Sequence, residues 1–101
     1  MNMTDLHRLQ KRVGDLARKR KHNEDPKIIL LFLLEELGEV ARAFLKEEGH
    51  KLDNPRILES YKQELGDVLF LLLQLADVKE IDLEEQLNYT IQKLTDRTEG
   101  L

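Results

Sequence analysis

Hydrophobic positions recur every three or four residues along most of this chain, which is the period of an amphipathic α-helix. The first apolar stripe consists of Leu6, Leu9, Val13 and Leu16 and predicts a helix near the N-terminus. Thr4 is placed to cap this helix. A similar stripe predicts the last helix and consists of Leu83, Leu87, Ile91 and Leu94. Because no strand pattern competes with these stripes, we expect an all-α protein.

Residues suited to helix ends divide the chain further and predict four helices in all. The second helix begins at Asp25-Pro26, since Asp is a good N-cap and Pro suits the first helical position, and it ends near Gly49. Asn54-Pro55 repeats this start signal and opens a third helix that reaches about Val78. The segment Asp82-Leu83-Glu84-Glu85 has the form of a capping box and opens the fourth.

Short connections between these helices predict an antiparallel, four-helix bundle-like protomer. Residues 28–34 are seven consecutive apolar residues and cover every side of nearly two helical turns. A helix that is apolar all round has to be buried all round. We therefore expect the second and third helices to meet their counterparts in another subunit, as a homodimer or a dimer of dimers (a homotetramer).

The composition fits one soluble globular domain over residues 1–101, with 36% charged and 41% hydrophobic residues. The chain has no cysteine, which excludes disulfides and thiol chemistry and fits a reducing compartment. Its longest apolar run is far shorter than the roughly 20 residues that a membrane span needs. The N-terminal residues lack the apolar core of a signal peptide. We therefore expect a cytoplasmic protein without a membrane partner.

Charge is distributed unevenly along the chain, whose net charge is −4. Residues 1–22 hold seven Lys or Arg against two Asp, whereas the remainder holds nine basic and eighteen acidic residues. No aromatic residue is interleaved with the basic run to stack on bases, so nucleic acid is an unlikely partner. Because acidic residues predominate after residue 22, the candidate functional groups are carboxylates.

Two acidic motifs with helical spacing adjoin the two most apolar stretches. They are Glu35-Glu36-Leu37-Gly38-Glu39 and Glu64-Leu65-Gly66-Asp67. Residues three or four apart share a helix face, so each motif forms an acidic edge, and antiparallel packing would let the two edges face each other. Gly38 and Gly66, one in each motif, are explained by a close approach of the helices or by the need for room for a ligand between the two acidic edges.

Carboxylates beside an apolar core are costly unless something pairs with them, and neither motif contains a cation. All-oxygen ligation suits Mg²⁺, with Mn²⁺ as an alternative. A di-iron site is disfavoured, because the one Glu-x-x-His pair, Glu47 and His50, is interrupted by a glycine. A zinc site is disfavoured by the absence of cysteine. The competing interpretation is a solvated helix face, which is the commonest place for carboxylates.

The doubled motif, with its 24-residue spacer, resembles the signature of the MazG-like nucleoside triphosphate pyrophosphohydrolases, and the resemblance extends over roughly residues 6–97. It implies an all-α oligomer that hydrolyses nucleoside triphosphates to the monophosphate and pyrophosphate with Mg²⁺. It further implies metal ligation by Glu36, Glu39, Glu64 and Asp67. Glu35 lies at a variable position of the signature. It would either hold the catalytic residues Glu36 and Glu39 in place or orient the attacking water.

Lys93 and Arg97 resemble the family's basic tail and lie one helical turn apart, so they are candidates to bind the substrate's phosphates. A solvated C-terminal turn explains the same pair. House-cleaning of the nucleotide pool is the leading function. The alternatives are a phosphoribosyl-ATP pyrophosphohydrolase and a non-catalytic helical module. The sequence does not identify the nucleobase of the substrate. Tyr61 and Tyr89 are the aromatic candidates to stack on it, whereas the phenylalanines are expected in the core or an interface.

Overall fold

The structure is a computed structural model that describes residues 5–49 and 60–100. Over these two ranges the chain forms four α-helices and no strand. The helices are α1 (Leu6–Lys19), α2 (Pro26–Glu47), α3 (Tyr61–Val78) and α4 (Leu83–Glu99). The predicted all-α class is confirmed.

Two of the predicted helix starts are found where the sequence places them. The Asp25 carboxylate accepts a hydrogen bond from the backbone N–H of Lys27 at 2.9 Å, with Pro26 as the first residue of α2. The Asp82 carboxylate likewise accepts from the backbone of Glu85 at the start of α4. At α1 the N-cap is Asp5, and the predicted cap Thr4 lies outside the described residues. Local capping chemistry therefore fixes where these helices begin.

The third helix differs from its prediction at the N-terminal end. The expected start at Asn54-Pro55 lies outside the described residues, but Ser60 has extended backbone and forms a reciprocal capping box with Gln63. A single helix running from Pro55 to Val78 is therefore wrong, because a capping box marks a helix start at Tyr61.

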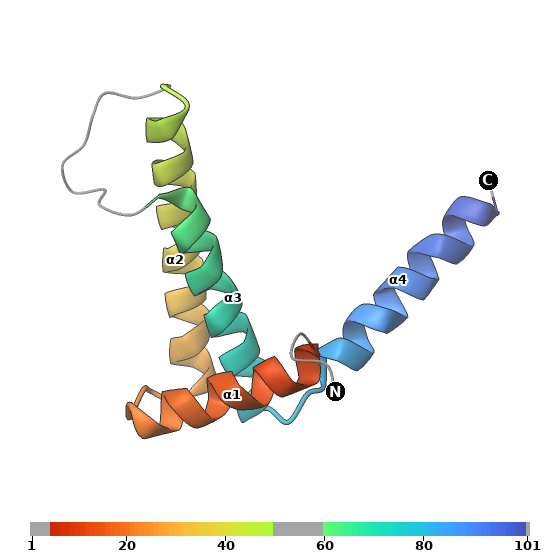
Figure 1. Ribbon diagram of the computed structural model, residues 1–101, viewed down its shortest axis with the longest axis horizontal. Coiled ribbons are helices and arrows are strands. Elements are labelled where there is room, and N and C mark those ends of the chain that lie inside the picture. Colours follow the sequence, from red (N-terminus) through yellow and green to blue (C-terminus); the bar gives the residue numbers. More distant parts are fainter. Residues whose placement is uncertain (1–4, 50–59, 101) are drawn as a thin grey trace.

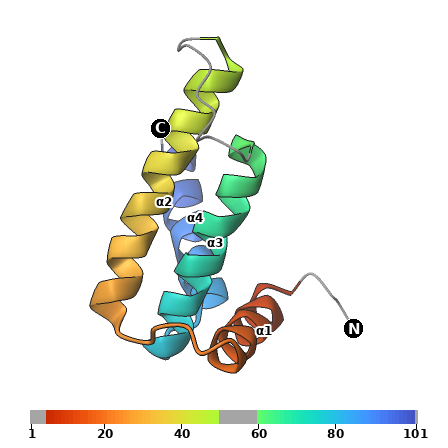
Figure 2. The ribbon, with the colours of Figure 1, turned by 90° about the vertical axis from the view of Figure 1, so that its left-hand side faces the viewer.

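Helices α2 and α3 pack side by side in antiparallel directions, and α1 crosses them near the N-terminal end of α2 (Figures 1 and 2). The buried apolar side chains of these three helices are all small or aliphatic. They are Ala17, Ile29, Ala43, Leu73 and Ala76. This α2–α3 pair positions the two acidic motifs.

Helix α4 does not complete a bundle within the chain, which corrects the predicted four-helix bundle-like protomer. It contacts α1 near its start and then extends away from α2 and α3 (Figure 1). The Gln10 amide of α1 binds both sides of the connecting turn: Nε2 donates to the Ile81 carbonyl at 2.6 Å, and Oε1 accepts from the Leu83 N–H at 3.2 Å. These long-range bonds help fix the direction of α4.

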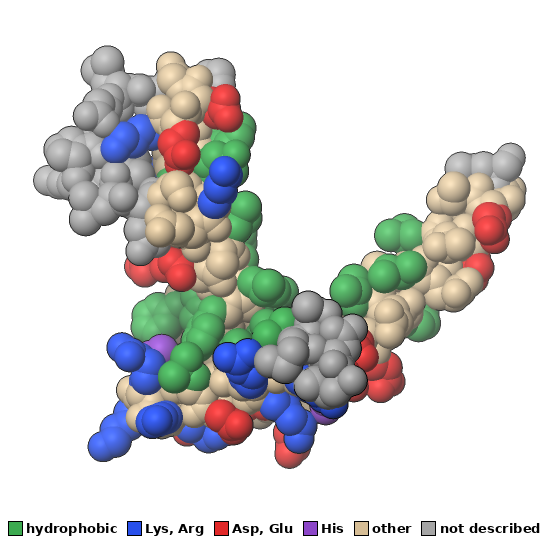
Figure 3. Space-filling model, viewed as in Figure 1, with side chains coloured by type: hydrophobic (Ala, Val, Ile, Leu, Met, Phe, Trp, Pro, Cys, Tyr) green, Lys and Arg blue, Asp and Glu red, His purple; other side chains and the backbone are tan. Residues whose placement is uncertain are grey.

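Large apolar side chains remain exposed on the α2–α3 pair and on α4, where green surface is visible on both (Figure 3). Leu31 and Leu34 on α2 are 60% and 66% exposed, and Ile91 on α4 is 53% exposed. Such exposure fits helices that are covered in an assembly, and the homodimer or homotetramer stays a prediction. Within the described residues, no helix combines the length and apolarity needed to cross a membrane.

Candidate functional site

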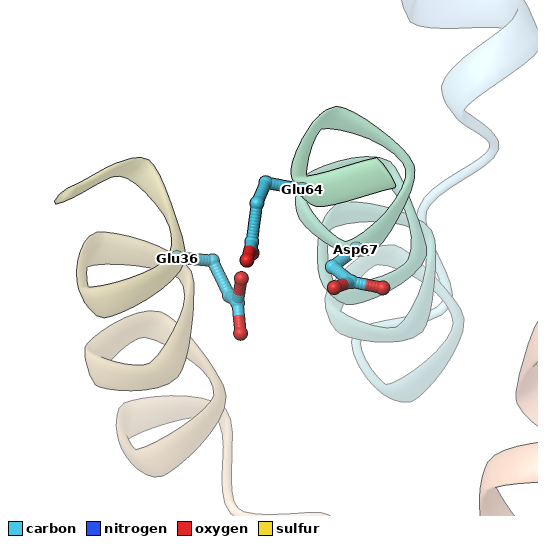
Figure 4. A group of neighbouring side chains, drawn as sticks. All are labelled: Glu36, Glu64 and Asp67. Atoms are coloured by element: carbon cyan, nitrogen blue, oxygen red, sulfur yellow. The ribbon is translucent and has the colours of Figure 1, made fainter. Parts of the chain in front are cut away.

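The two acidic motifs meet across the interface between α2 and α3. Glu36 projects from α2, and Glu64 and Asp67 project from α3 toward it (Figure 4). One carboxylate oxygen from each of these three residues lies within 4.8 Å of the others. Carboxylate oxygens gathered in this way are suited to a hard divalent cation such as Mg²⁺ or Mn²⁺.

Burial differs within this carboxylate cluster (Glu36, Glu64 and Asp67): Glu64 is buried, Glu36 is half-buried and Asp67 is exposed. Desolvation, a hydrogen bond with Glu64 and the nearby negative charges of Glu64, Asp67 and Glu39 together raise the pKa of Glu36 to about 7. Glu64 is only 9% exposed. The Glu36 Oε2 atom is buried and has no hydrogen-bond partner within residues 5–49 and 60–100. A buried acceptor of this kind is costly unless a ligand satisfies it, so the donor set fits a divalent cation.

Glu39, the fourth predicted metal ligand, is placed differently. Its carboxylate pairs with the guanidinium of Arg42 one turn further along α2. Its oxygens are not among those gathered in the carboxylate cluster, and its ligation of a metal stays a prediction. Glu35, predicted to be catalytic, borders a cavity beside Glu36.

The two predicted phosphate-binding residues lie on α4, the helix that extends away from α2 and α3 (Figure 1). The Lys93 ammonium lies 5.8 Å from the centre of the Tyr89 ring, and both residues border a shallow hollow together with Arg97. Within one chain, the structure does not bring Lys93 and Arg97 to the carboxylate cluster. Their phosphate role stays a prediction.

A cavity of about 320 Å³ opens beside the carboxylate cluster. Glu35, Glu36 and Asp67 line one part of it, and the remaining lining residues are His22, Asn23, Phe32, Phe70, Leu71 and Gln74. Of this second set, Phe32 and Phe70 were predicted to lie in the core or an interface, and no site role was predicted for the other four residues. Helical spacing carried the signal, because Phe32 precedes Glu36 by four residues and Phe70 follows Asp67 by three.

The glycines within the acidic motifs are not at close helix contacts inside the chain. Among the residues that the structure describes, a Cβ atom built on Gly38 would come no nearer than 3.8 Å, to the Arg42 side chain, and one on Gly66 would meet nothing within 4 Å. Close approach of α2 and α3 at these positions is therefore wrong as an explanation. The tight position is Gly14 of α1, where a Cβ atom would overlap the Asp77 carboxylate.

Comparison with known proteins gives matches over most of the chain. A family model described as the MazG nucleotide pyrophosphohydrolase domain matches residues 24–101. A crystal structure of YPJD from Bacillus subtilis, described as a candidate pyrophosphatase, is similar in fold with a TM-score of 0.80 and 32% sequence identity. The alignment covers 93% of this chain and 96% of that protein. No curated protein matches the chain significantly.

Proposed function

The chain belongs to the MazG nucleotide pyrophosphohydrolase family, and on this premise we propose that it hydrolyses nucleoside triphosphates to the nucleoside monophosphate and pyrophosphate in a Mg²⁺-dependent reaction. The observation that carries the proposal is the convergence of Glu36, Glu64 and Asp67 around a buried oxygen that lacks a partner. We further propose that the reaction removes unwanted nucleotides from the cellular pool.

Glu36, Glu64 and Asp67 would hold the divalent cation, and Glu39 would join them if its pair with Arg42 opened. A cation bound there supplies the positive charge that a triphosphate, with about four negative charges, needs in order to approach this acidic surface. Glu36 would be ionised beside such a cation, whose charge would offset the burial and the neighbouring negative charges that raise the pKa of this residue.

Glu35 is the residue we assign to the attacking water. It borders the cavity next to Glu36, where its carboxylate can accept a hydrogen bond from a water molecule and its proton. The water oxygen attacks the α-phosphorus, the bond between that phosphorus and the bridging oxygen breaks, and pyrophosphate leaves. The water proton passes through Glu35 to solvent. No side-chain nucleophile is required, which agrees with a chain that has no cysteine.

A second copy of the chain would complete the phosphate site. Lys93 and Arg97 lie on the helix that extends away from its own carboxylate cluster. We propose that α4 of a neighbouring copy brings these cations toward the outer phosphates, where they would offset the charge of the leaving pyrophosphate. This makes the active form a homodimer or homotetramer.

The test is an assay of pyrophosphate release over the common ribo- and deoxyribonucleoside triphosphates and phosphoribosyl-ATP, with Mg²⁺ or with a chelator. We expect Mg²⁺-dependent release from at least one nucleoside triphosphate. Glu64→Gln and Asp67→Asn should reduce the rate by at least about a hundred-fold. Glu85→Gln, which removes a carboxylate from the exposed surface of α4, is the matched control and should remain active.

Three outcomes would contradict the proposal. Activity confined to phosphoribosyl-ATP would identify the chain as a phosphoribosyl-ATP pyrophosphohydrolase instead. No turnover with any nucleotide, together with no effect of Mg²⁺ on melting, would indicate a non-catalytic helical module. Full activity of Glu64→Gln and Asp67→Asn would place the active site elsewhere.

A further inference from the structure

Beyond its carboxylates, the cavity is lined by aromatic and aliphatic side chains together with two side-chain amides. The rings of His22 and Phe70 meet edge to face, with centroids 6.0 Å apart and planes at 66°. Phe32 on α2 and Leu71 on α3 line the same space. Aromatic rings with an accessible face are the platforms on which planar heterocycles stack.

One of these amides, that of Gln74, is buried. Gln74 is only 2% exposed, and its Nε2 donates a hydrogen bond to the backbone carbonyl of Asn23 at 3.0 Å. This bond orients the amide, because only the nitrogen end can donate to a carbonyl. The Gln74 Oε1 atom accepts no hydrogen bond from the described residues and is left as an acceptor.

A second amide in the lining is oriented in the opposite sense. The Asn23 Oδ1 atom accepts a hydrogen bond from the Asp25 backbone N–H at 2.8 Å, which leaves the Nδ2 group as a donor. Asn23 and Gln74 therefore offer one donor and one acceptor, and each is oriented by a bond to the backbone. A ligand edge with an acceptor beside a donor complements this pair.

We propose that this end of the cavity binds the nucleobase, stacked on the aromatic side chains with its hydrogen-bonding edge toward Asn23 and Gln74. The inference rests on the proposed function, because it needs a ligand whose other end is a phosphate group near Glu36 and Asp67. The cavity, at about 320 Å³, borders both kinds of lining residue and has room for a base and its sugar. It selects bases that carry an N–H donor next to a ring or carbonyl acceptor.

Unphosphorylated nucleosides test this inference without the metal or the reaction. The full chain is titrated, in the presence of a chelator, with adenosine, guanosine, cytidine and uridine, and the His and Phe ring signals are followed by NMR. We expect saturable binding of at least one nucleoside. Its analogue without the exocyclic amino group (purine riboside for adenosine, pyrimidinone riboside for cytidine) or with the ring N–H methylated (for guanosine or uridine) should bind at least about five-fold more weakly.

Two substitutions with matched controls locate the binding. Phe70→Leu removes a stacking surface and should weaken the nucleoside at least about five-fold. Asn23→Asp keeps the oxygen that accepts from Asp25 and removes the free donor, so it should weaken binding without affecting the fold. Phe44→Leu, at a ring that pairs with Tyr61, and Asn88→Asp, on the exposed surface of α4, should bind nucleoside like the unaltered chain.

The outcomes separate this inference from the proposed function. No nucleoside binding up to the solubility limit, or equal binding by Asn23→Asp and Asn88→Asp, would overturn the base site even if pyrophosphate is released from triphosphates. Nucleoside binding that depends on Phe70 and Asn23, without pyrophosphate release from any nucleotide, would uphold the base site and overturn the proposed reaction.

Discussion

Glu36 of α2 and Glu64 of α3 face each other across the helix interface with carboxylate oxygens within 4.8 Å, and a hydrogen bond between the two groups adds to the effect of burial in raising the pKa of Glu36. The bond links the two acidic motifs directly. It also makes the metal-free chain sensitive to the ionisation of Glu36, whose pKa of about 7 lies well above the ordinary value of 4.5. A cation and a proton are thus alternative ways to stabilise the same carboxylates.

The first prediction concerns the pH dependence of stability without metal. Folding raises the pKa of the Glu36 carboxyl group, so the folded chain is more stable with the group protonated than with it ionised. This stability is fully present below the pKa of the unfolded chain and is lost as the pH rises through the pKa of the folded chain. Between pH 4.5 and about 7, the chain should lose on the order of 1–3 kcal/mol of unfolding free energy. Denaturant unfolding in the presence of a chelator measures the change. A Glu36→Gln variant with the same pH dependence would contradict the prediction.

The second prediction concerns the charge of Glu36 itself. Glu36→Gln removes a carboxylate that is penalised by burial and by three like charges, while an amide can still donate to Glu64. Without metal at about pH 8, the variant should melt several degrees higher than the unaltered chain, since about 1 kcal/mol corresponds to roughly 4–8 °C in a domain of this size. Excess Mg²⁺ should then raise its melting temperature less than that of the unaltered chain. A lower melting temperature in chelator would refute this electrostatic account.

The third prediction concerns the contact of α1 with α3. Gly14 lies against the Asp77 carboxylate, which binds the Arg18 guanidinium at 2.7 Å and therefore has little freedom to move. Gly14→Ala should cost about 1–3 kcal/mol of unfolding free energy, because overpacking forces the neighbours to shift. In an Asp77→Ala background the same change should cost much less. Equal costs in the two backgrounds would show that the Cβ atom does not meet Asp77.

The fourth prediction concerns the turn before α4. The Gln10 side chain is 6% exposed and binds the backbone of Ile81 and Leu83. Gln10→Leu leaves both backbone groups without this partner and should cost about 1–3 kcal/mol per group that stays buried. Amide hydrogen exchange at Leu83 should accelerate. Gln92→Leu, which removes an exposed contact with Asp96, is the control and should change stability by at most about 0.5 kcal/mol.

The described helices were predictable largely because their signals are local. The start of α2 depends on Asp25 and Pro26, and the start of α4 depends on Asp82, all within one turn of the residues they cap. The direction of α4 depends instead on Gln10, which lies 71 residues away from Ile81 along the chain. Hydrophobic periodicity carries no information about such a contact, so it predicted the stripe of α4 but not its departure from the bundle.

The candidate site was predictable to a similar depth. Spacing alone placed Glu36, Glu64 and Asp67 on facing helix edges, and the structure brings these three together. Glu39 has Arg42 three residues further along the same helix. The prediction of Glu39 as a metal ligand left this cation out, and it pairs with the same carboxylate. Phe32 and Phe70 were predicted only as core or interface residues, because their helical spacing from Glu36 and Asp67 indicates a cavity wall only once the packing of α2 on α3 is known.

Direct measurement of divalent metal binding tests the central claim, that Glu36, Glu64 and Asp67 form one cation site. Mn²⁺ binding to the full chain, followed by electron paramagnetic resonance, should show a site that Mg²⁺ displaces. Glu64→Gln and Asp67→Asn should each weaken it at least about ten-fold, the loss seen even for groups that only support a ligand, and Glu85→Gln should not. Binding of equal strength in all four proteins would contradict the claim.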